Sequence, residues 1–192
     1  ALRDEGITGV TSNPSIFQAA ISSGSDYDDQ ILGSAQKGIA PAQIFEEIAV
    51  ADIRDACEIF RPVYQSTNGI DGYVSLEVSP KLAYDTDGTM DEARRLWGLV
   101  NRPNLMIKVP GTSQGVPAFK QLIAEGINVN VTLLFSVERY REVALSYVEG
   151  LQQLNDAGGD VARVASVASF FVSRVDTAVD ALLEGKGNAE LQ

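Results

Sequence analysis

The chain has 192 residues, enough for one sizeable core, and a formal net charge of −11, which disfavours nucleic acid or an anionic membrane as its main partner. It has no histidine, and this excludes Ser-His and Cys-His nucleophile pairs and imidazole metal sites. Its single cysteine, Cys57, excludes an intrachain disulfide and favours a reducing, cytoplasmic setting, and the sequence shows neither a signal peptide nor an apolar run long enough to cross a bilayer.

Short apolar runs alternate with helical patterns along the chain. The runs predict strands at residues 9–12, 72–78, 105–109, 128–134 and 161–169, and the patterns between and after them predict helices at residues 14–20, 41–60, 90–100, 116–125, 137–151 and 172–183. This alternation is typical of parallel β/α units joined by right-handed crossovers. It predicts one α/β domain over residues 1–192.

Polar or ionisable residues stand at the carboxyl ends of these predicted strands. In α/β folds this edge of the sheet binds ligands, and in a β/α barrel it is the catalytic face. Groups that served stability alone would be scattered along the strands. The clustering therefore predicts a shared site, and its candidates are Ser12, Asn13, Glu77, Lys108, Thr132 and Ser169.

Lys108 is the most informative of these candidates, because it interrupts the apolar run of residues 105–109 just before Pro110 and Gly111. Lysine is almost never fully buried unless it is paired or functional. Burial disfavours the charged form of an amine and makes it a usable nucleophile near neutral pH. This segment alone leaves a second interpretation open, a strand-end lysine that extends its amine to solvent.

The number of strands is too small for a closed barrel. We predict five strands, whereas a (β/α)₈ barrel has eight and about 250 residues. Residues 1–6 also resemble the end of a helix, and the chain stops shortly after another helix. We therefore expect the sequence to be the middle of a longer protein.

Five motifs in order along the chain together strongly resemble transaldolase, and their sequences are most similar to those of the longer actinobacterial-type branch. They are residues 9–15 (GVTSNPS), 75–78 (SLEV), 106–112 (MIKVPGT), 126–136 (GINVNVTLLFS) and 169–174 (SFFVSR). The resemblance implies a class I aldolase-type (β/α)₈ TIM barrel with strands two to six present here. It also implies transfer of a dihydroxyacetone unit from a ketose phosphate, such as sedoheptulose 7-phosphate, to glyceraldehyde 3-phosphate. This is a pentose phosphate pathway reaction that uses no metal or cofactor.

The resemblance assigns the imine chemistry to three residues. Lys108 matches the family's Schiff-base lysine, and Glu77 matches the glutamate that moves protons through a bound water. Thr132 matches the threonine that helps to hold this water. The alternatives are a Glu77 carboxylate that merely pairs with Lys108, and a Thr132 that is simply a β-branched strand residue.

Two asparagines match the residues that hold the substrate's hydroxyl groups. They are Asn13 and Asn130. Asn13 precedes a proline and is equally suited to cap a helix, and it could do both. Asn130 has an alternative role as a turn former at the end of a strand.

Ser169 and Arg174 match the family's phosphate-binding serine and arginine. Guanidinium suits phosphate because its planar fork donates two hydrogen bonds at once. The alternative for Arg174 is a surface salt bridge to Asp176 or Glu184.

Some positions differ between this sequence and the families it is compared with. Phe171 replaces the tyrosine of the related fructose-6-phosphate aldolases, and Glu77 stands where those enzymes carry glutamine, so both favour the transferase. Phe170 replaces the proline usual after the phosphate-site serine. The family's cleavage aspartate would lie before Ala1, and its second phosphate-binding arginine and strands seven and eight would lie beyond Gln192.

Three functions remain open from the sequence. The first is a transaldolase acting on sugar phosphates. The second is a truncated, non-catalytic barrel remnant that serves as a binding or scaffold protein, whose open strands and apolar faces a partner would cover. The third is a fructose-6-phosphate-type aldolase. A homo-oligomer that completes the sheet across subunits would fit either of the first two.

Overall fold

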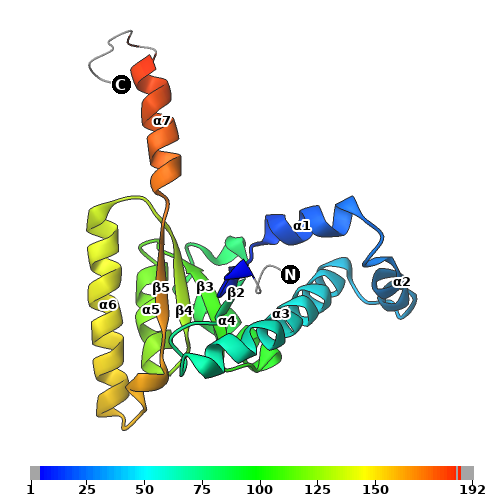
Figure 1. Ribbon diagram of the computed structural model, residues 1–192, viewed down its shortest axis with the longest axis horizontal. Coiled ribbons are helices and arrows are strands. Elements are labelled where there is room, and N and C mark those ends of the chain that lie inside the picture. The colour runs from blue at the N-terminus through cyan, green and yellow to red at the C-terminus, as the bar shows by residue number, and fades with distance from the viewer. Residues whose placement is uncertain (1–4, 185, 187–192) are drawn as a thin grey trace.

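The computed structural model describes residues 5–184 and residue 186. Its centre is one sheet of parallel strands, arranged in chain order from β1 to β5 (Figure 1). The strands are β1 Val10–Thr11, β2 Val74–Glu77, β3 Leu105–Pro110, β4 Val129–Leu134 and β5 Ser166–Phe170. The predicted α/β class is confirmed, and the curved sheet is a half-barrel consistent with part of a TIM barrel.

Helices follow each strand, as the sequence patterns predicted. They are α1 Pro14–Ser23, α2 Asp28–Gln36, α3 Pro41–Ser66, α4 Thr86–Val100, α5 Gly115–Ala124, α6 Val137–Asp156 and α7 Val172–Glu184, with short 3₁₀ turns η2 Pro80–Leu82 and η3 Val161–Arg163. Among the helices of the described residues, none is long and apolar enough to cross a membrane.

Several parts of this arrangement differ from the prediction. Helix α3 continues to Ser66 instead of residue 60, and α4 begins at Thr86 instead of residue 90. Helix α2 was missed because it is short and mostly polar, with Asp28 and Asp29 in its first turn. The last strand begins at Ser166 and not at Val161. Residues 161–163 instead form a 3₁₀ turn whose first residue follows Asp160, and the Asp160 side chain accepts a hydrogen bond from the Ala162 amide.

The hydrophobic core lies between one face of the sheet and helices α3 to α6. Successive strand residues point to opposite faces, so Leu76, Ile107, Val109 and Val131 pack on the helical side. Between α5 and α6, the backbones approach closely at Gly150, where an added Cβ would lie 2.7 Å from the Lys120 carbonyl oxygen. Helices α3 to α6 therefore cover one face of the sheet.

The opposite face of the sheet is lined with polar groups. The registers of β2, β3 and β4 place Glu77 beside Lys108 and Lys108 beside Asn130. Residues in register on parallel strands point to the same side, and so do residues two apart on one strand. Ser75 and Thr132 therefore share this inner face, and all four of Ser75, Lys108, Asn130 and Thr132 are buried.

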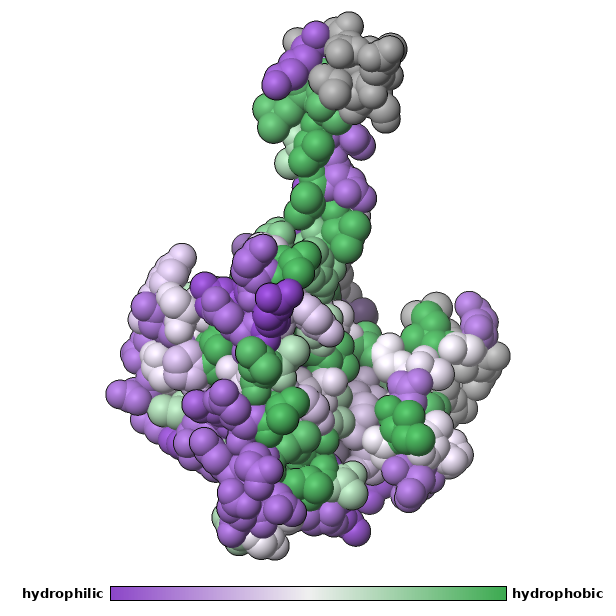
Figure 2. Space-filling view, turned by 90° about the vertical axis from the view of Figure 1, so that its left-hand side faces the viewer, coloured by the Kyte–Doolittle hydropathy of each residue, from purple (hydrophilic) through white to green (hydrophobic). Residues whose placement is uncertain are grey.

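Helix α7 has a different environment from the other helices. It continues away from the sheet beyond β5 (Figure 1), and none of its described side chains is buried. Val172, Val179 and Leu182 are among its exposed apolar residues. Figure 2, which views the molecule from the side of α6, shows hydrophobic surface along α7 and in patches on the body below it.

Phe119 is expected to be one of the costliest core residues to truncate. It is fully buried on α5, and its ring stacks on Tyr147 of α6 at 6.4 Å between centroids. Phe119→Ala should lower the free energy of unfolding by about 3–5 kcal/mol, because a large cavity remains. Phe135→Ala removes a ring that is 47% exposed and should cost about 1 kcal/mol. Urea unfolding of both variants measures the difference, and equal losses would contradict this account of the core.

Candidate active site

The centre of the polar face is the amine of Lys108. Lys108 is only 7% exposed, and its Nζ lies 3.1 Å from Glu77 Oε2 on the neighbouring strand. The two side chains meet because β2 and β3 pair in register at these residues, near the carboxyl ends of both strands. A lysine that extends its amine into solvent is therefore the wrong interpretation of this segment.

A second acceptor holds the Lys108 amine on the side of β1. Lys108 Nζ donates to the Ser12 carbonyl oxygen at 3.3 Å. Ser12 is itself fixed, because its amide and its hydroxyl both donate to the Ser75 carbonyl oxygen, at 3.2 and 2.7 Å. An ammonium group has three donors. Glu77 and Ser12 together use two of them and aim the amine along the inner face.

Glu77 contacts the Lys108 amine directly, so the pairing considered in the sequence analysis is present. Its side chain is 13% exposed, compared with 9% for the side chain of Lys108. Two charges removed from water at this depth are costly unless they are paired. The contact offsets part of the desolvation cost of both groups, and it holds the carboxylate within hydrogen-bonding distance of the amine.

Thr132 supplies a buried hydroxyl with no protein partner. It lies on β4 in register with Pro110 and is 1% exposed, and its Oγ1 finds no hydrogen bond in the described part of the chain. Buried hydroxyls are normally satisfied, by ordered water where protein groups do not reach them. The site therefore has a polar position at Thr132 that suits a bound water.

Asn130 is held from both sides across the sheet. Its Nδ2 donates to Ser75 Oγ at 3.1 Å, and its Oδ1 accepts from Ser169 Oγ at 2.8 Å. Asn130 lies inside β4, so its alternative role as a turn former is wrong. Ser75 and Ser169 belong to β2 and β5, and the three side chains form a polar line across the inner face.

Asn13 lies at the edge of this group, and the structure confirms its role as a helix cap. Its Oδ1 accepts a hydrogen bond of 2.9 Å from the Ile16 amide at the start of α1. The residue is half-buried and follows Ser12, whose carbonyl contacts Lys108. Its amide nitrogen is not used in the cap.

The structure does not bring the two predicted phosphate residues into contact. The Ser169 hydroxyl donates to Asn130, whereas Arg174 lies on α7 with its guanidinium 4.5 Å from the Phe171 ring centroid. Phe171 in turn stacks on Phe135 at 5.4 Å. Within residues 5–184, Arg174 forms no salt bridge that would explain its position, and no hydrogen bond joins it to Ser169.

Sequence reasoning missed Ser75 as a site residue and saw Ser12 only as one of several polar residues at strand ends. Ser75 lies two residues before Glu77 on the same strand and so on the same face, a period-two signal that was available. The role of Ser12 depends on its backbone carbonyl, and no side-chain pattern reports that.

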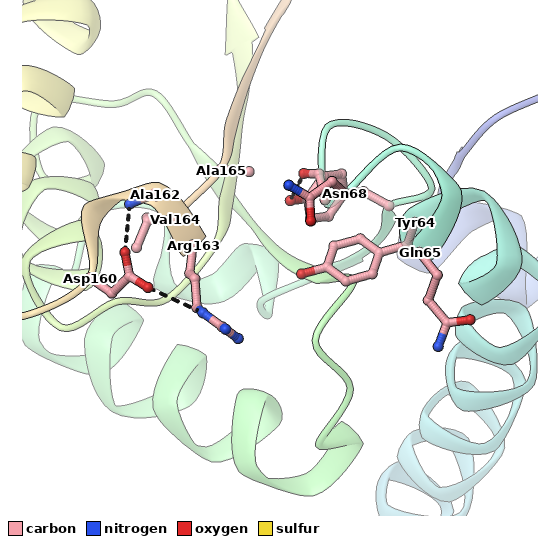
Figure 3. Close-up of a pocket in the computed structure, with 10 residues that line it drawn as sticks. Tyr64, Gln65, Asn68, Asp160, Ala162, Arg163, Val164 and Ala165 are labelled. Carbon is pink, nitrogen blue, oxygen red and sulfur yellow. Dashed lines mark hydrogen bonds and ion pairs between the residues drawn. The ribbon is translucent and has the colours of Figure 1, made fainter.

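A hollow of about 530 Å³ opens at the amino ends of β2 and β5, away from the polar groups at the carboxyl ends (Figure 3). Tyr64, Tyr73, Asp160 and Arg163 line it. Burial raises the pKa of Tyr73 to about 12, and its hydroxyl donates to the Gly69 carbonyl oxygen. None of the predicted site residues lines this hollow, and in residues 5–184 no three acidic or cysteine side chains gather as a metal site.

Comparison with known proteins agrees with the resemblance seen in the motifs. The family model described as transaldolase/fructose-6-phosphate aldolase matches residues 1–192. The transaldolase of Acidothermus cellulolyticus is 50% identical over 191 residues, which are 100% of this chain and 51% of that protein. The transaldolase of Saccharopolyspora erythraea is 52% identical over 192 residues, 100% of this chain and 52% of that protein.

A further relative is the transaldolase of Thermobifida fusca, 54% identical over 174 residues, 91% of this chain and 47% of that protein. The chain thus spans about half the length of the curated relatives it matches. Because the family model covers every residue, and the polar face carries a buried lysine paired with a glutamate, the chain belongs to the transaldolase/fructose-6-phosphate aldolase family.

Proposed function

We propose that this chain carries the imine-forming part of a transaldolase site. The substrate would be a ketose phosphate such as sedoheptulose 7-phosphate, and the acceptor glyceraldehyde 3-phosphate. The observation that carries this proposal is the buried Lys108 amine, held 3.1 Å from the Glu77 carboxylate at the carboxyl edge of a parallel sheet.

In the first step, Lys108 must lose a proton before it can attack. Glu77 is placed to accept that proton, because its Oε2 already receives a hydrogen bond from Nζ. The neutral amine then adds to the ketose carbonyl carbon, and a proton moves from the nitrogen to the carbonyl oxygen to give a neutral carbinolamine. Glu77 returns its proton to the carbinolamine hydroxyl, which leaves as water, and the product is an iminium ion. The iminium accepts the electron pair of the carbon–carbon bond that breaks next.

Thr132 would hold the water that carries protons between Glu77 and the reacting oxygen. Its unpartnered, buried hydroxyl supports this role. Asn130 would bind hydroxyl groups of the three-carbon unit from the adjacent strand. Asn13 would contribute the amide nitrogen that its helix cap does not use.

The phosphate group is assigned to Arg174, with Ser169 as a second contact. The guanidinium carbon of Arg174 lies over the Phe171 ring, and its N–H donors are not engaged in a salt bridge within the described residues. In the structure the Ser169 hydroxyl proton is directed at Asn130, so Ser169 must rotate to donate to a phosphate oxygen.

Two observations favour the transferase over the other two functions. Glu77 is ionisable, whereas the glutamine of the fructose-6-phosphate aldolases cannot accept a proton, and Phe171 replaces their tyrosine. A scaffold protein would gain nothing from a buried amine–carboxylate pair, because removing each ion from water costs roughly several kcal/mol. A cytoplasmic setting in the pentose phosphate pathway accompanies this proposal.

Product analysis separates the three functions. The chain is incubated with sedoheptulose 7-phosphate, with and without glyceraldehyde 3-phosphate. A transaldolase produces fructose 6-phosphate only when the acceptor is present. Release of free dihydroxyacetone without acceptor would identify an aldolase. A borohydride-trapped adduct without any product would limit the chain to imine formation, and neither adduct nor product would identify the scaffold.

We expect Thr132→Val to separate activity from stability. Valine keeps the shape but removes a hydroxyl that lacks a protein partner, so unfolding free energy should be unchanged or slightly higher. Imine formation should slow about tenfold, as loss of one hydrogen bond to the water predicts.

The matched control for this variant is Thr89→Val on α4. Thr89 is equally buried, but its hydroxyl donates to the Leu82 carbonyl oxygen at 2.9 Å. This variant should lose about 1–3 kcal/mol in urea unfolding and keep its rate of imine formation. The opposite pattern would remove Thr132 from the mechanism.

A further inference from the structure

We infer that Ser75 is a positioning residue, which acts on the reaction by holding the side-chain amide of Asn130 in place beside Lys108. The inference rests on the proposed function for the role of Asn130. Ser75 itself is 4% exposed and matches none of the roles that the motifs assign.

The contact is a hydrogen bond between strands that are not neighbours. Asn130 Nδ2 on β4 donates to Ser75 Oγ on β2 at 3.1 Å, so the bond passes over β3. The residue of β3 in register with Ser75 is Met106, and the residue in register with Asn130 is Lys108. The bond therefore runs across the inner face from the level of Lys108 to the level of Met106, next to the lysine that would carry the imine.

The other end of the amide is held as well. Asn130 Oδ1 accepts from Ser169 Oγ at 2.8 Å. A carboxamide has two N–H donors and two acceptor lone pairs. Ser75 uses one donor and leaves the other for the substrate. Ser169 occupies one lone pair until its hydroxyl rotates toward a phosphate oxygen, so Ser75 is the support that stays in place when substrate binds.

Ser75 is also fixed by the backbone that aims Lys108. Its carbonyl oxygen accepts from both the amide and the hydroxyl of Ser12, and the Ser12 carbonyl accepts from Lys108 Nζ. Ser75 thus links Ser12, which holds the Lys108 amine, to the side-chain amide of Asn130. A displacement of Ser75 would change the distance between the two groups that would bind one substrate.

The expected consequence is a loss of affinity with little change in the limiting rate. In Ser75→Ala, Asn130 keeps only one of its two supports, and the Lys108–Glu77 pair is untouched. One hydrogen bond of this kind corresponds to about a 3- to 10-fold effect. We therefore expect the half-saturating concentration of fructose 6-phosphate for imine formation to rise by about that factor. The limiting rate should stay within about twofold.

The test combines a double-mutant cycle with a measurement that does not depend on activity. Borohydride-trapped adduct is measured against fructose 6-phosphate concentration for the full 192-residue chain, Ser75→Ala, Asn130→Ala and the double variant. If Ser75 acts through Asn130, Ser75→Ala should change nothing once Asn130 is alanine. Ser75→Cys, which keeps a weak acceptor, should fall between Ser75→Ala and the parent chain.

The second readout is the Asn130 side-chain NH₂ signal in a ¹⁵N NMR spectrum, assigned by its absence in Asn130→Ala. Its hydrogen exchange should quicken in Ser75→Ala and not in Ser34→Ala, a buried serine on α2 that bonds Glu47 at 3.1 Å. Unchanged exchange in Ser75→Ala, or losses that add in the double variant, would overturn the inference. Failure of the parent chain to form any adduct would overturn the proposed function instead, while the exchange rate still decides whether Ser75 holds Asn130.

Discussion

Replacing Lys108 by methionine or by arginine is expected to abolish imine formation with fructose 6-phosphate. Methionine has similar length but no nitrogen, and arginine keeps the charge beside Glu77 but is not a nucleophile at neutral pH. Intact mass after borohydride reduction should show one sugar adduct on the parent chain and background signal for both variants. Two variants are used because Lys108→Met leaves the Glu77 carboxylate, 13% exposed, without its partner, whereas Lys108→Arg keeps a cation there.

The matched control is Lys120→Arg. Lys120 also lies 3.1 Å from a carboxylate, that of Glu149, but the pair is on the surface between α5 and α6. Exposed pairs contribute little to stability, about 0–1 kcal/mol. This variant should form the adduct as the parent chain does. If Lys120→Arg lost the adduct and Lys108→Arg kept it, the inner face of the sheet would not be the reactive site.

Glu77→Gln is expected to slow imine formation about 10²-fold or more, within the range of about 10² to 10⁴ that general acid–base groups contribute. The amide keeps the size of the carboxylate and a hydrogen bond to Lys108, but it cannot accept the proton that the amine must lose. Stopped reactions with borohydride at increasing times give the rate. Glu149→Gln, which removes the charge from the surface pair with Lys120, should leave that rate unchanged. A similar rate in Glu77→Gln and the parent chain would limit Glu77 to pairing with Lys108.

The strands could be predicted because each has a local signal, and the convergence of Glu77 and Lys108 at one edge of the sheet follows from their positions at strand ends. Their direct ion pair was only the alternative interpretation of Glu77. The apolar run around Lys108 has the length of a buried strand, and proline and glycine end it. Once the strands are parallel and in order, their carboxyl ends share one edge of the sheet. The meeting of Glu77 and Lys108 then follows from register alone.

The supports around the pair could not be predicted, because they join residues far apart in sequence. Ser75 and Asn130 are 55 positions apart, and Ser12 and Lys108 are 96 apart. A hydroxyl or an amide can both donate and accept hydrogen bonds, so the residue type alone does not predict which partner it has. The same limit applies to Asn128, which reaches the Leu105 carbonyl oxygen with its Nδ2 and accepts from the Ala165 amide.

The sequence also could not place Arg174 relative to Ser169. The two residues are close in the motif, but a helix begins at Val172, between them. Ser169 stays in the strand with its hydroxyl on Asn130, while Arg174 turns with the helix and lies against Phe171. The motif identifies both residues, but their spacing does not show that the chain changes from strand to helix between them, and this change sets the two side chains apart.

The most direct test of this account is to locate the adduct in the chain. The parent chain is treated with fructose 6-phosphate and borohydride, digested and mapped by peptide mass spectrometry. We predict a single reduced adduct on Lys108, in the peptide that contains β3. An adduct on Lys81 or Lys120 with Lys108 unmodified would contradict the assignment of the buried ion pair as the catalytic centre.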